Sequence, residues 1–138
     1  MGIEPAANIA KMARAEGIET VSDFFSQKLA HDVVKKYGQA DLATATNVFA
    51  HIDDLDEVIK GLKILLKDNG VFIIEAPYLI DFLQKRYFDL VYHEHLSYWS
   101  VDSLKTLFKR FNMTVFRVEK VPVHGGTIRV FIKRNNGK

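Results

Sequence analysis

The sequence predicts an α/β domain built on a mostly parallel, doubly wound sheet. Helical and strand patterns alternate along the chain, and glycines lie between them. Alternation of this kind is typical of βαβ units, whose strands pair in parallel. The last two strand patterns are separated only by Pro122 and a Gly-Gly pair at 125–126, as in a hairpin. We therefore expect an antiparallel edge on an otherwise parallel sheet.

The first quarter of the chain predicts a helix and a short strand. Pro5 suits the first turn of a helix, and an apolar stripe that includes Ile9 and Met12 stops at Gly17. Residues 18–25 are predicted as a short strand and loop. A second helix is expected to follow this loop.

That second helix is predicted between Ser26, whose hydroxyl can cap it, and Gly38, which can end it. Residues 42–49 alternate weakly and are rich in Ala and Thr, which is typical of a buried strand. The middle of the chain therefore predicts a helix followed by an inner strand.

Asp53 is predicted to cap the clearest helix, in which the apolar residues between 55 and 66 follow a three-four spacing. We expect Gly70 to close it. Residues 71–76 form a continuous apolar strand pattern that Pro77 stops. A long connection follows.

Ser100 is predicted to cap the last helix, whose inward residues are Leu104, Leu107, Phe108 and Phe111. Two strand patterns, at 114–118 and 127–132, close the chain. The pattern therefore ends in a helix and the antiparallel pair.

Composition excludes several classes of protein. With 138 residues, 48% of them hydrophobic, the chain is one domain large enough to bury a core. Its net charge of +2 comes from scattered basic residues, which argues against a nucleic-acid partner. The absence of cysteine excludes disulfides and thiolate chemistry. No apolar run approaches the roughly 20 residues that span a bilayer, so we expect no membrane partner and a cytoplasmic protein.

The segment 92–100 carries the strongest chemical signal. It holds two imidazoles, a carboxylate and three aromatic residues. Imidazole exchanges a proton near neutral pH at little cost, which favours a catalytic pocket. The alternative is a loop of surface histidines before a helix.

Other polar residues follow the predicted strands where ligands bind in doubly wound sheets, beyond the carboxyl ends. Glu4 ends the first fragment, Asp23 follows the next strand, and Asn47 and His51 follow the third. Together with residues 92–95 they indicate one binding site on this rim.

Four segments carry a resemblance: Gly-Ile-Glu-Pro at 2–5, Asn-Val-Phe-Ala-His-Ile at 47–52, Tyr-His-Glu-His-Leu-Ser-Tyr at 92–98, and His-Gly-Gly-Thr-Ile-Arg-Val at 124–130. At these residues the chain resembles the S-adenosylmethionine-dependent C-methyltransferases that act on nucleotide-linked keto-deoxysugars. The resemblance covers essentially all 138 residues and implies a class I methyltransferase, Rossmann-like three-layer sandwich.

The resemblance implies S-adenosyl-L-methionine as the cofactor. Glu4, followed by Pro5, would accept hydrogen bonds from the ribose hydroxyls; alternatively its carboxylate only favours a helix N-terminus. Asp23 and Phe24 would border the adenine, although Phe24 is equally suited to core packing. Asn47 would line the methionine end.

The implied reaction is methylation of the carbon next to a ketone through an enolate. His95 would remove the proton from that carbon, and Glu94 would orient the imidazole or bind the substrate. His51 and Tyr92 would donate hydrogen bonds to the enolate oxygen. The alternative for His51 is a residue that only caps or packs.

Two further positions are candidate substrate contacts. His124 precedes the Gly-Gly pair, which either lets substrate approach the backbone or merely forms the turn. Arg129 is suited to binding phosphate, or it is an outward-facing strand residue.

The chain departs from this family at both ends: the N-terminal cysteine-rich metal-binding region and the C-terminal domain that the resemblance implies are missing, and so is the glycine-rich loop. The resemblance implies a glycine-rich loop roughly 20 residues before the ribose-binding acid, and only residues 1–3 precede Glu4. We therefore expect residues 1–138 to form a single partial methyltransferase domain without its first strand-loop unit. Residues 18–25 should then shift onto the strand at 42–49 or pair with another chain, and the open edge favours a homodimer.

Two other functions remain open. A non-catalytic remnant could bind a nucleotide sugar or dimerise without turnover. A metal site formed by His51, His93, Glu94 and His95 is the second alternative, although no close pair of histidines on a helix supports it.

Overall fold

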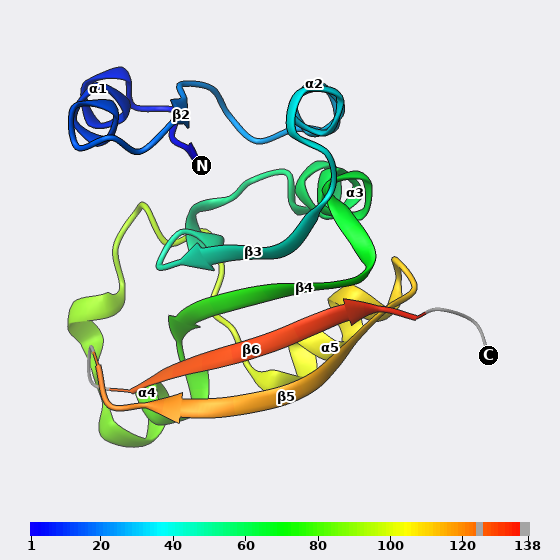
Figure 1. Ribbon diagram of the computed structural model, residues 1–138. Helices are drawn as coiled ribbons and strands as arrows, with labels where there is room; N and C mark the ends of the chain where they lie inside the picture. The colour runs from blue at the N-terminus through cyan, green and yellow to red at the C-terminus, as the bar shows by residue number, and fades with distance from the viewer. Residues whose placement is uncertain (124–125, 136–138) are drawn as a thin grey trace.

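The computed structural model describes residues 1–123 and 126–135 and has an α/β architecture, as the sequence predicts (Figure 1). Its elements are β1 (Gly2–Ile3), α1 (Ala7–Ala15), β2 (Thr20–Val21), α2 (Gln27–Tyr37), β3 (Ala40–Thr46), the short 3-10 helix η1 (Phe49–His51), α3 (Leu55–Leu65), β4 (Leu66–Pro77), α4 (Leu79–Lys85), η2 (Phe88–Leu90), α5 (Val101–Lys109), β5 (Met113–Val121) and β6 (Thr127–Arg134).

The main sheet has the strand order β3-β4-β6-β5. Strands β3 and β4 are parallel, whereas β6 is antiparallel to both β4 and β5. The predicted terminal hairpin is present, but its antiparallel strand lies inside the sheet and β5 forms the edge. The reason is pairing: β6 lies in continuous register with β4, with Ile74 opposite Val130.

Strands β1 and β2 form a separate parallel pair, with Gly2 opposite Thr20 and Ile3 opposite Val21. The expectation that residues 18–25 shift onto the third strand, or pair only with another chain, is therefore wrong. Backbone hydrogen bonds on both sides hold this pair: the Gly2 amide donates to Glu19, and the Glu4 amide donates to Val21. Within the described residues, β3 pairs only with β4, so its other edge is open.

The core lies on one face of the main sheet, under α3 and α5. Buried apolar residues of β4 and β6 alternate toward these helices, because successive strand residues point to opposite faces. Phe49 lies at the centre of this core, and its ring centroid is 5.4–6.1 Å from those of Phe72, Trp99 and Phe108.

The opposite face of the main sheet is less covered. Figure 1 shows α5 behind the sheet and no helix of the described chain across the near face of β6 and β5. Phe116 and Phe131 pair their rings on this face at 6.2 Å. The prediction of a buried strand at residues 42–49 is wrong, since Leu42 on β3 is 54% exposed. Met12 on α1 is exposed too, so the predicted apolar stripe of that helix does not reach the core.

Local sequence signals explain the helix ends. The hydroxyl of Ser26 accepts a hydrogen bond from the Leu29 amide, and Gly38 ends α2 with a φ of 80°. Ser100 caps α5 in a reciprocal capping box with Ser103. These three predicted ends are confirmed.

The third helix differs from its prediction at both ends. Asp54, not Asp53, caps α3 by accepting a hydrogen bond from the Glu57 amide. The helix ends at Leu65 rather than at Gly70, because Leu66 already pairs with Ala40 in the sheet. A Cβ on Gly70 would lie only 3.0 Å from the Ala40 carbonyl oxygen, so this glycine permits close approach of the two strands.

The long connection after β4 is not structureless. It contains α4 and η2, neither of which was predicted. Among the described residues, no helix combines the length and apolar character required to cross a membrane.

Candidate functional site

Two segments far apart in sequence meet beyond the carboxyl ends of β3 and β4. After β3, Asn47 adopts a positive φ of 54°, which turns the chain into η1. The Ala50 carbonyl oxygen then accepts hydrogen bonds from the amides of Leu96 and Ser97, at 3.0 and 3.2 Å. These bonds attach the segment 92–98 to η1 and bring His95 of that segment next to His51.

His51 is oriented by the backbone of that segment. Its Nδ1 lies 2.8 Å from the carbonyl oxygen of Glu94, an acceptor only, so Nδ1 carries the proton and donates. In the neutral ring, Nε2 is then an acceptor. The ring centroids of His51 and His95 lie 4.9 Å apart, so the structure brings together two imidazoles that are 44 positions apart in the sequence.

Aromatic residues surround His95. Its Nε2 lies 3.0 Å from the hydroxyl oxygen of Tyr92, and the two ring centroids are 4.2 Å apart. Tyr98 approaches the imidazole edge-on at 5.9 Å, and Phe82 of α4 lies 5.6 Å from Tyr98. The half-buried imidazole is thereby fixed in position, which a group that takes a proton from a bound substrate requires.

The acidic residue of the segment contributes differently from the expectation. The carbonyl oxygen of Glu94, not its carboxylate, contacts His51, and the side chain is exposed. His93 is exposed as well. Both residues lie in a tight turn, in which the His95 amide donates to the Tyr92 carbonyl.

A second group of predicted residues follows β1 and β2. Glu4 comes directly after β1, before the exposed Pro5, and one of its carboxylate oxygens accepts a hydrogen bond from the Ala6 amide at 2.8 Å. Asp23 follows β2 and accepts a hydrogen bond from the Phe24 amide at 2.8 Å. The Phe24 side chain is 75% exposed and is not part of the core. Within residues 1–123 and 126–135, no recorded hydrogen bond or ring contact joins this group to the histidines.

The remaining predicted site residues are Asn47, Arg129 and His124, which do not lie together in one group. Asn47 lies at the turn before η1, where its amide donates to the Glu75 carbonyl. Arg129 lies on β6 and binds the carboxylate of Glu75 through Nε and Nη2, at 3.0 and 2.8 Å, with Glu119 at 3.9 Å. His124 lies outside the described residues.

Sequence reasoning missed a charged cluster between α4 and the β5–β6 hairpin. Asp81, which is buried, pairs with Lys120 at 2.8 Å and with Lys85 at 3.5 Å. The hydrogen bond from Lys120 lowers the pKa of the Asp81 carboxyl and raises the pKa of the Lys120 ammonium. The only signal in the sequence was the four-residue spacing of Asp81 and Lys85, which matters only once α4 is known to be helical.

The alternative interpretation of His51, His93, Glu94 and His95 is a metal site. Among the described residues, no three His, Asp or Glu side chains are arranged to hold an ion. The side chains of His51, His95 and Tyr92 instead contact one another through their rings and through the Tyr92 hydroxyl.

Comparison with known proteins identifies relatives. The family model described as a methyltransferase domain matches residues 1–118. Over 131 residues the chain is 40% identical to the C-methyltransferase NovU of Streptomyces niveus. That alignment covers 95% of this chain and 31% of NovU, so the chain spans about a third of the length of this curated relative.

Solved structures match the fold. A putative type 11 methyltransferase from Sulfolobus solfataricus superposes with a TM-score of 0.68 at 19% identity, covering 99% of this chain and 70% of that one. A possible histamine N-methyltransferase from Thermotoga maritima, described as SAM-dependent, gives 0.68 at 18% identity, with coverages of 95% and 72%. At these identities the likeness concerns the fold alone, and it confirms the predicted Rossmann-like class.

Proposed function

The chain belongs to the methyltransferase domain family, and we propose that it provides the substrate-side residues and part of the cofactor site of an S-adenosylmethionine-dependent C-methyltransferase. The observation that carries this proposal is the 40% identity to a C-methyltransferase across 95% of the chain. The cluster of His51, His95 and Tyr92 beyond the carboxyl ends of the strands supports it further.

The residues after β1 and β2 fit S-adenosylmethionine. The Glu4 carboxylate has two oxygens, of which the Ala6 amide uses one, so the other suits a ribose hydroxyl. The exposed ring of Phe24 suits the face of a purine, and the Asp23 carboxylate suits its amino group. Asn47, exposed after β3, suits the amino-acid end. When bound, this cofactor supplies an electrophilic methyl group.

For the substrate we infer a nucleotide-linked keto-deoxysugar, methylated at the carbon next to its ketone. The chain must then remove a proton from that carbon, and His95 is the base. Its hydrogen bond to Tyr92 fixes the plane of the ring, whichever of the two groups donates. For the Tyr92 O–H to donate to the ketone oxygen, the hydroxyl oxygen accepts from His95 Nε2–H, so Nδ1 of His95 is the nitrogen that takes the proton.

His51 has a narrower role than the sequence suggests. Because its Nδ1–H donates to the Glu94 carbonyl, the neutral ring has no second N–H for an enolate oxygen. Only the protonated ring can donate through Nε2. We therefore assign His51 to act at Nε2 as a hydrogen-bond acceptor for the substrate beside His95, whose ring centroid lies 4.9 Å away, or as an imidazolium donor.

Titration of the ¹⁵N-labelled chain with S-adenosylhomocysteine tests the cofactor part. We expect saturable amide shifts at Glu4, Asp23 and Asn47, and loss of those shifts in Glu4→Ala. The matched control is Glu16→Ala, an exposed acid at the end of α1. Unchanged affinity in Glu4→Ala would remove this residue from the site.

Methyl transfer to a nucleotide-linked keto-sugar tests the catalytic part. His95→Ala should abolish transfer and leave the S-adenosylhomocysteine shifts in place, because the imidazole lies among substrate-side residues. His31→Ala, an exposed histidine on α2, is the control. Loss of cofactor binding in His95→Ala would instead give this residue a structural role.

A non-catalytic binding or dimerisation module is the second candidate, and the open edge of β3 favours it. In that case a second copy of the chain would pair along this edge. A well-dispersed spectrum without any shift on addition of S-adenosylhomocysteine would favour this module over the enzyme.

A further inference from the structure

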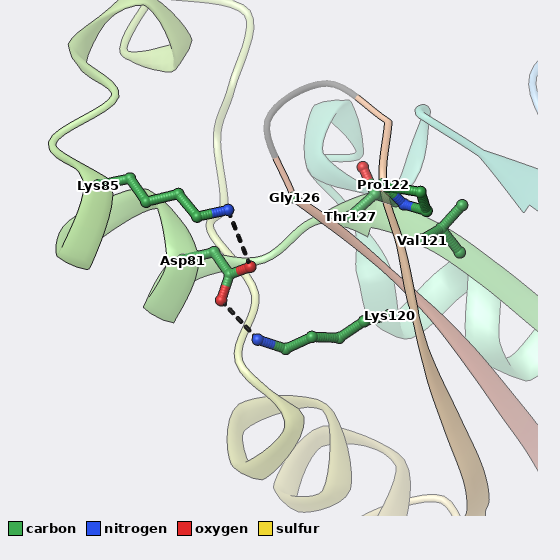
Figure 2. A pocket seen from close by; sticks show the side chains of 7 residues that line it. All are labelled: Asp81, Lys85, Lys120, Val121, Pro122, Gly126 and Thr127. Carbon is green, nitrogen blue, oxygen red and sulfur yellow. Dashed lines mark hydrogen bonds and ion pairs between the residues drawn. The ribbon is translucent and has the colours of Figure 1, made fainter.

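A cavity of about 380 Å³ lies between α4 and the strands β5 and β6 (Figure 2). Its wall includes Asp81 and Lys85 from α4, Lys120 from β5, and Gly126 and Thr127 at the start of β6. Its volume falls within the range of sites that hold small ligands, roughly 300–1,000 Å³. None of these residues belongs to the histidine cluster or to the cofactor side.

The charge of this cavity is positive. Figure 2 shows the ammonium groups of Lys85 and Lys120 converging on the carboxylate of Asp81 from two sides. The Lys120 Nζ lies 2.8 Å from one oxygen and the Lys85 Nζ lies 3.5 Å from the other. Because the interactions that lower the Asp81 pKa and raise the Lys120 pKa keep both groups ionised at neutral pH, the three side chains carry a net charge of +1.

The buried carboxylate fixes the positions of the two cations. The Asp81 side chain is only 11% exposed, whereas those of Lys85 and Lys120 are 47% and 67% exposed. Each ammonium also lies over an aromatic ring, Lys120 over Tyr78 at 5.2 Å and Lys85 over Tyr87 at 5.7 Å. An ammonium has three N–H donors, so the contact of Lys120 with Asp81 leaves this ammonium donors with which to bind an anion.

Helix α4 connects this cavity with the cluster of His51, His95 and Tyr92. Asp81 and Lys85 line the cavity, while the adjacent Phe82 contacts Tyr98, which in turn contacts His95. Successive helix residues point about 100° apart, so the two sites lie against different faces of one short helix. A substrate with a reacting sugar at one end and a charged group at the other matches this arrangement.

From these observations we propose that the cavity formed by Lys85, Lys120 and Asp81 binds the diphosphate of the nucleotide-linked substrate. Assignment to the substrate rests on the proposed function, whereas binding of the anion itself does not. The ligand chemistry is a phosphoryl oxyanion held by the ammonium groups of Lys85 and Lys120. Free inorganic phosphate is the other source of the same chemistry.

Amide-shift titrations of the ¹⁵N-labelled chain test this inference with three kinds of probe: inorganic pyrophosphate, the diphosphates of thymidine and uridine, and the two nucleosides without phosphate. We expect saturable shifts at Asp81, Lys85, Lys120, Gly126 and Thr127 with pyrophosphate and with a nucleoside diphosphate, and none at these residues with the nucleosides. Absence of shifts with pyrophosphate, or shifts spread over all lysines, would overturn the inference. Pyrophosphate shifts without nucleoside diphosphate shifts would overturn the assignment to the substrate.

Variants separate the cavity from general electrostatics. The double substitution Lys85→Gln/Lys120→Gln should weaken pyrophosphate binding by about tenfold or more, since it removes both charged donors of the cavity. The control Lys105→Gln/Lys109→Gln makes the same charge change on exposed positions of α5 and should have little effect. Equal weakening in both would contradict a built site. If loss of both lysines unfolds the chain, the wild-type shift map still decides.

A titration with S-adenosylhomocysteine on the same sample keeps the two proposals distinguishable. Shifts at the cavity with pyrophosphate and the nucleoside diphosphates support the inference whether or not the cofactor analogue binds. If Glu4 and Asp23 shift with the analogue, but no residue of the cavity shifts with pyrophosphate or a nucleoside diphosphate, the inference is overturned and the proposed function still stands.

Discussion

Substitution of Gly126 by alanine tests how closely the cavity wall is built. This residue has a φ of 140°, which L-residues rarely adopt. An added Cβ would lie 2.7 Å from Asp81 Oδ2 and 3.0 Å from Asp81 Cβ. The Asp81 carboxylate cannot move aside without breaking its ion pairs, because it is buried and paired with Lys120 and Lys85. The variant must therefore strain the backbone or break the ion pairs.

The magnitude follows from these two costs. An unfavourable positive φ costs about 1–3 kcal/mol, and overpacking typically costs another 1–3 kcal/mol. We expect Gly126→Ala to lose about 3 kcal/mol or more of the free energy of unfolding. At about 2.1 cal/mol/K of unfolding entropy per residue, a 138-residue chain loses roughly 3–4 °C in Tm for each kcal/mol, so the expected decrease is about 10 °C.

Thermal unfolding followed by circular dichroism provides the assay, and Gly17→Ala provides the control. Gly17 also has a positive φ, 81°, but no atom lies within 4 Å of its ideal Cβ. We expect that variant to lose only about 1–2 kcal/mol, the strain of a left-handed residue. The double variant Asp81→Ala/Gly126→Ala should be less destabilised than the sum of the single variants. An equal decrease in Tm for Gly126→Ala and Gly17→Ala would refute the steric reasoning.

Three further predictions concern the pH dependence, the core and the open edge. Because Lys120 lowers the Asp81 pKa in the folded state, the stabilisation is complete above the unfolded value, about 3.9, and is lost as pH falls through the folded pKa. The unfolding free energies of wild type and Asp81→Asn should thus differ at pH 7, and the difference should begin to shrink only below about pH 4. A difference that stays constant over the whole pH range would contradict this. Phe49→Ala should lower the free energy of unfolding, measured by chemical denaturation, by about 3–5 kcal/mol. The volume-conserving control Leu66→Met should lower it by at most about 1.5 kcal/mol, and equal losses in the two variants would argue against a packed aromatic centre. Sedimentation should detect association through β3 that Leu42→Lys weakens, and a monomeric wild type at high concentration would exclude it.

Local signals in the sequence predicted most helices and drew attention to the residues of the candidate site. Ser26 and Ser100 predicted helix starts because a cap is a contact between residues three apart. The same locality explains the confirmed hairpin of β5 and β6. The fold class followed from the alternation of these elements, and the histidine segment drew attention because its residue types adjoin in sequence.

The errors concern contacts between distant segments. A strand pattern does not state which neighbours the strand has, so the exposure of Leu42 and the interior position of β6 could not be predicted from residues 42–49 or 127–132. The separate pairing of β1 with β2 was missed for the same reason. The sequence pattern predicts that Gly70 ends a helix, whereas in the sheet this glycine permits close packing of β4 against Ala40.

The sequence by itself determined the class of fold, the kind of reactive groups and the helix caps, since all of these depend on composition and on residues within one or two turns. Only the tertiary structure decided that His51 faces His95, that the Glu94 backbone rather than its carboxylate orients an imidazole, and that Lys120 reaches Asp81 across 39 residues. The physical reason is that these contacts join segments whose relative positions depend on strand register and helix packing, which one local pattern does not encode.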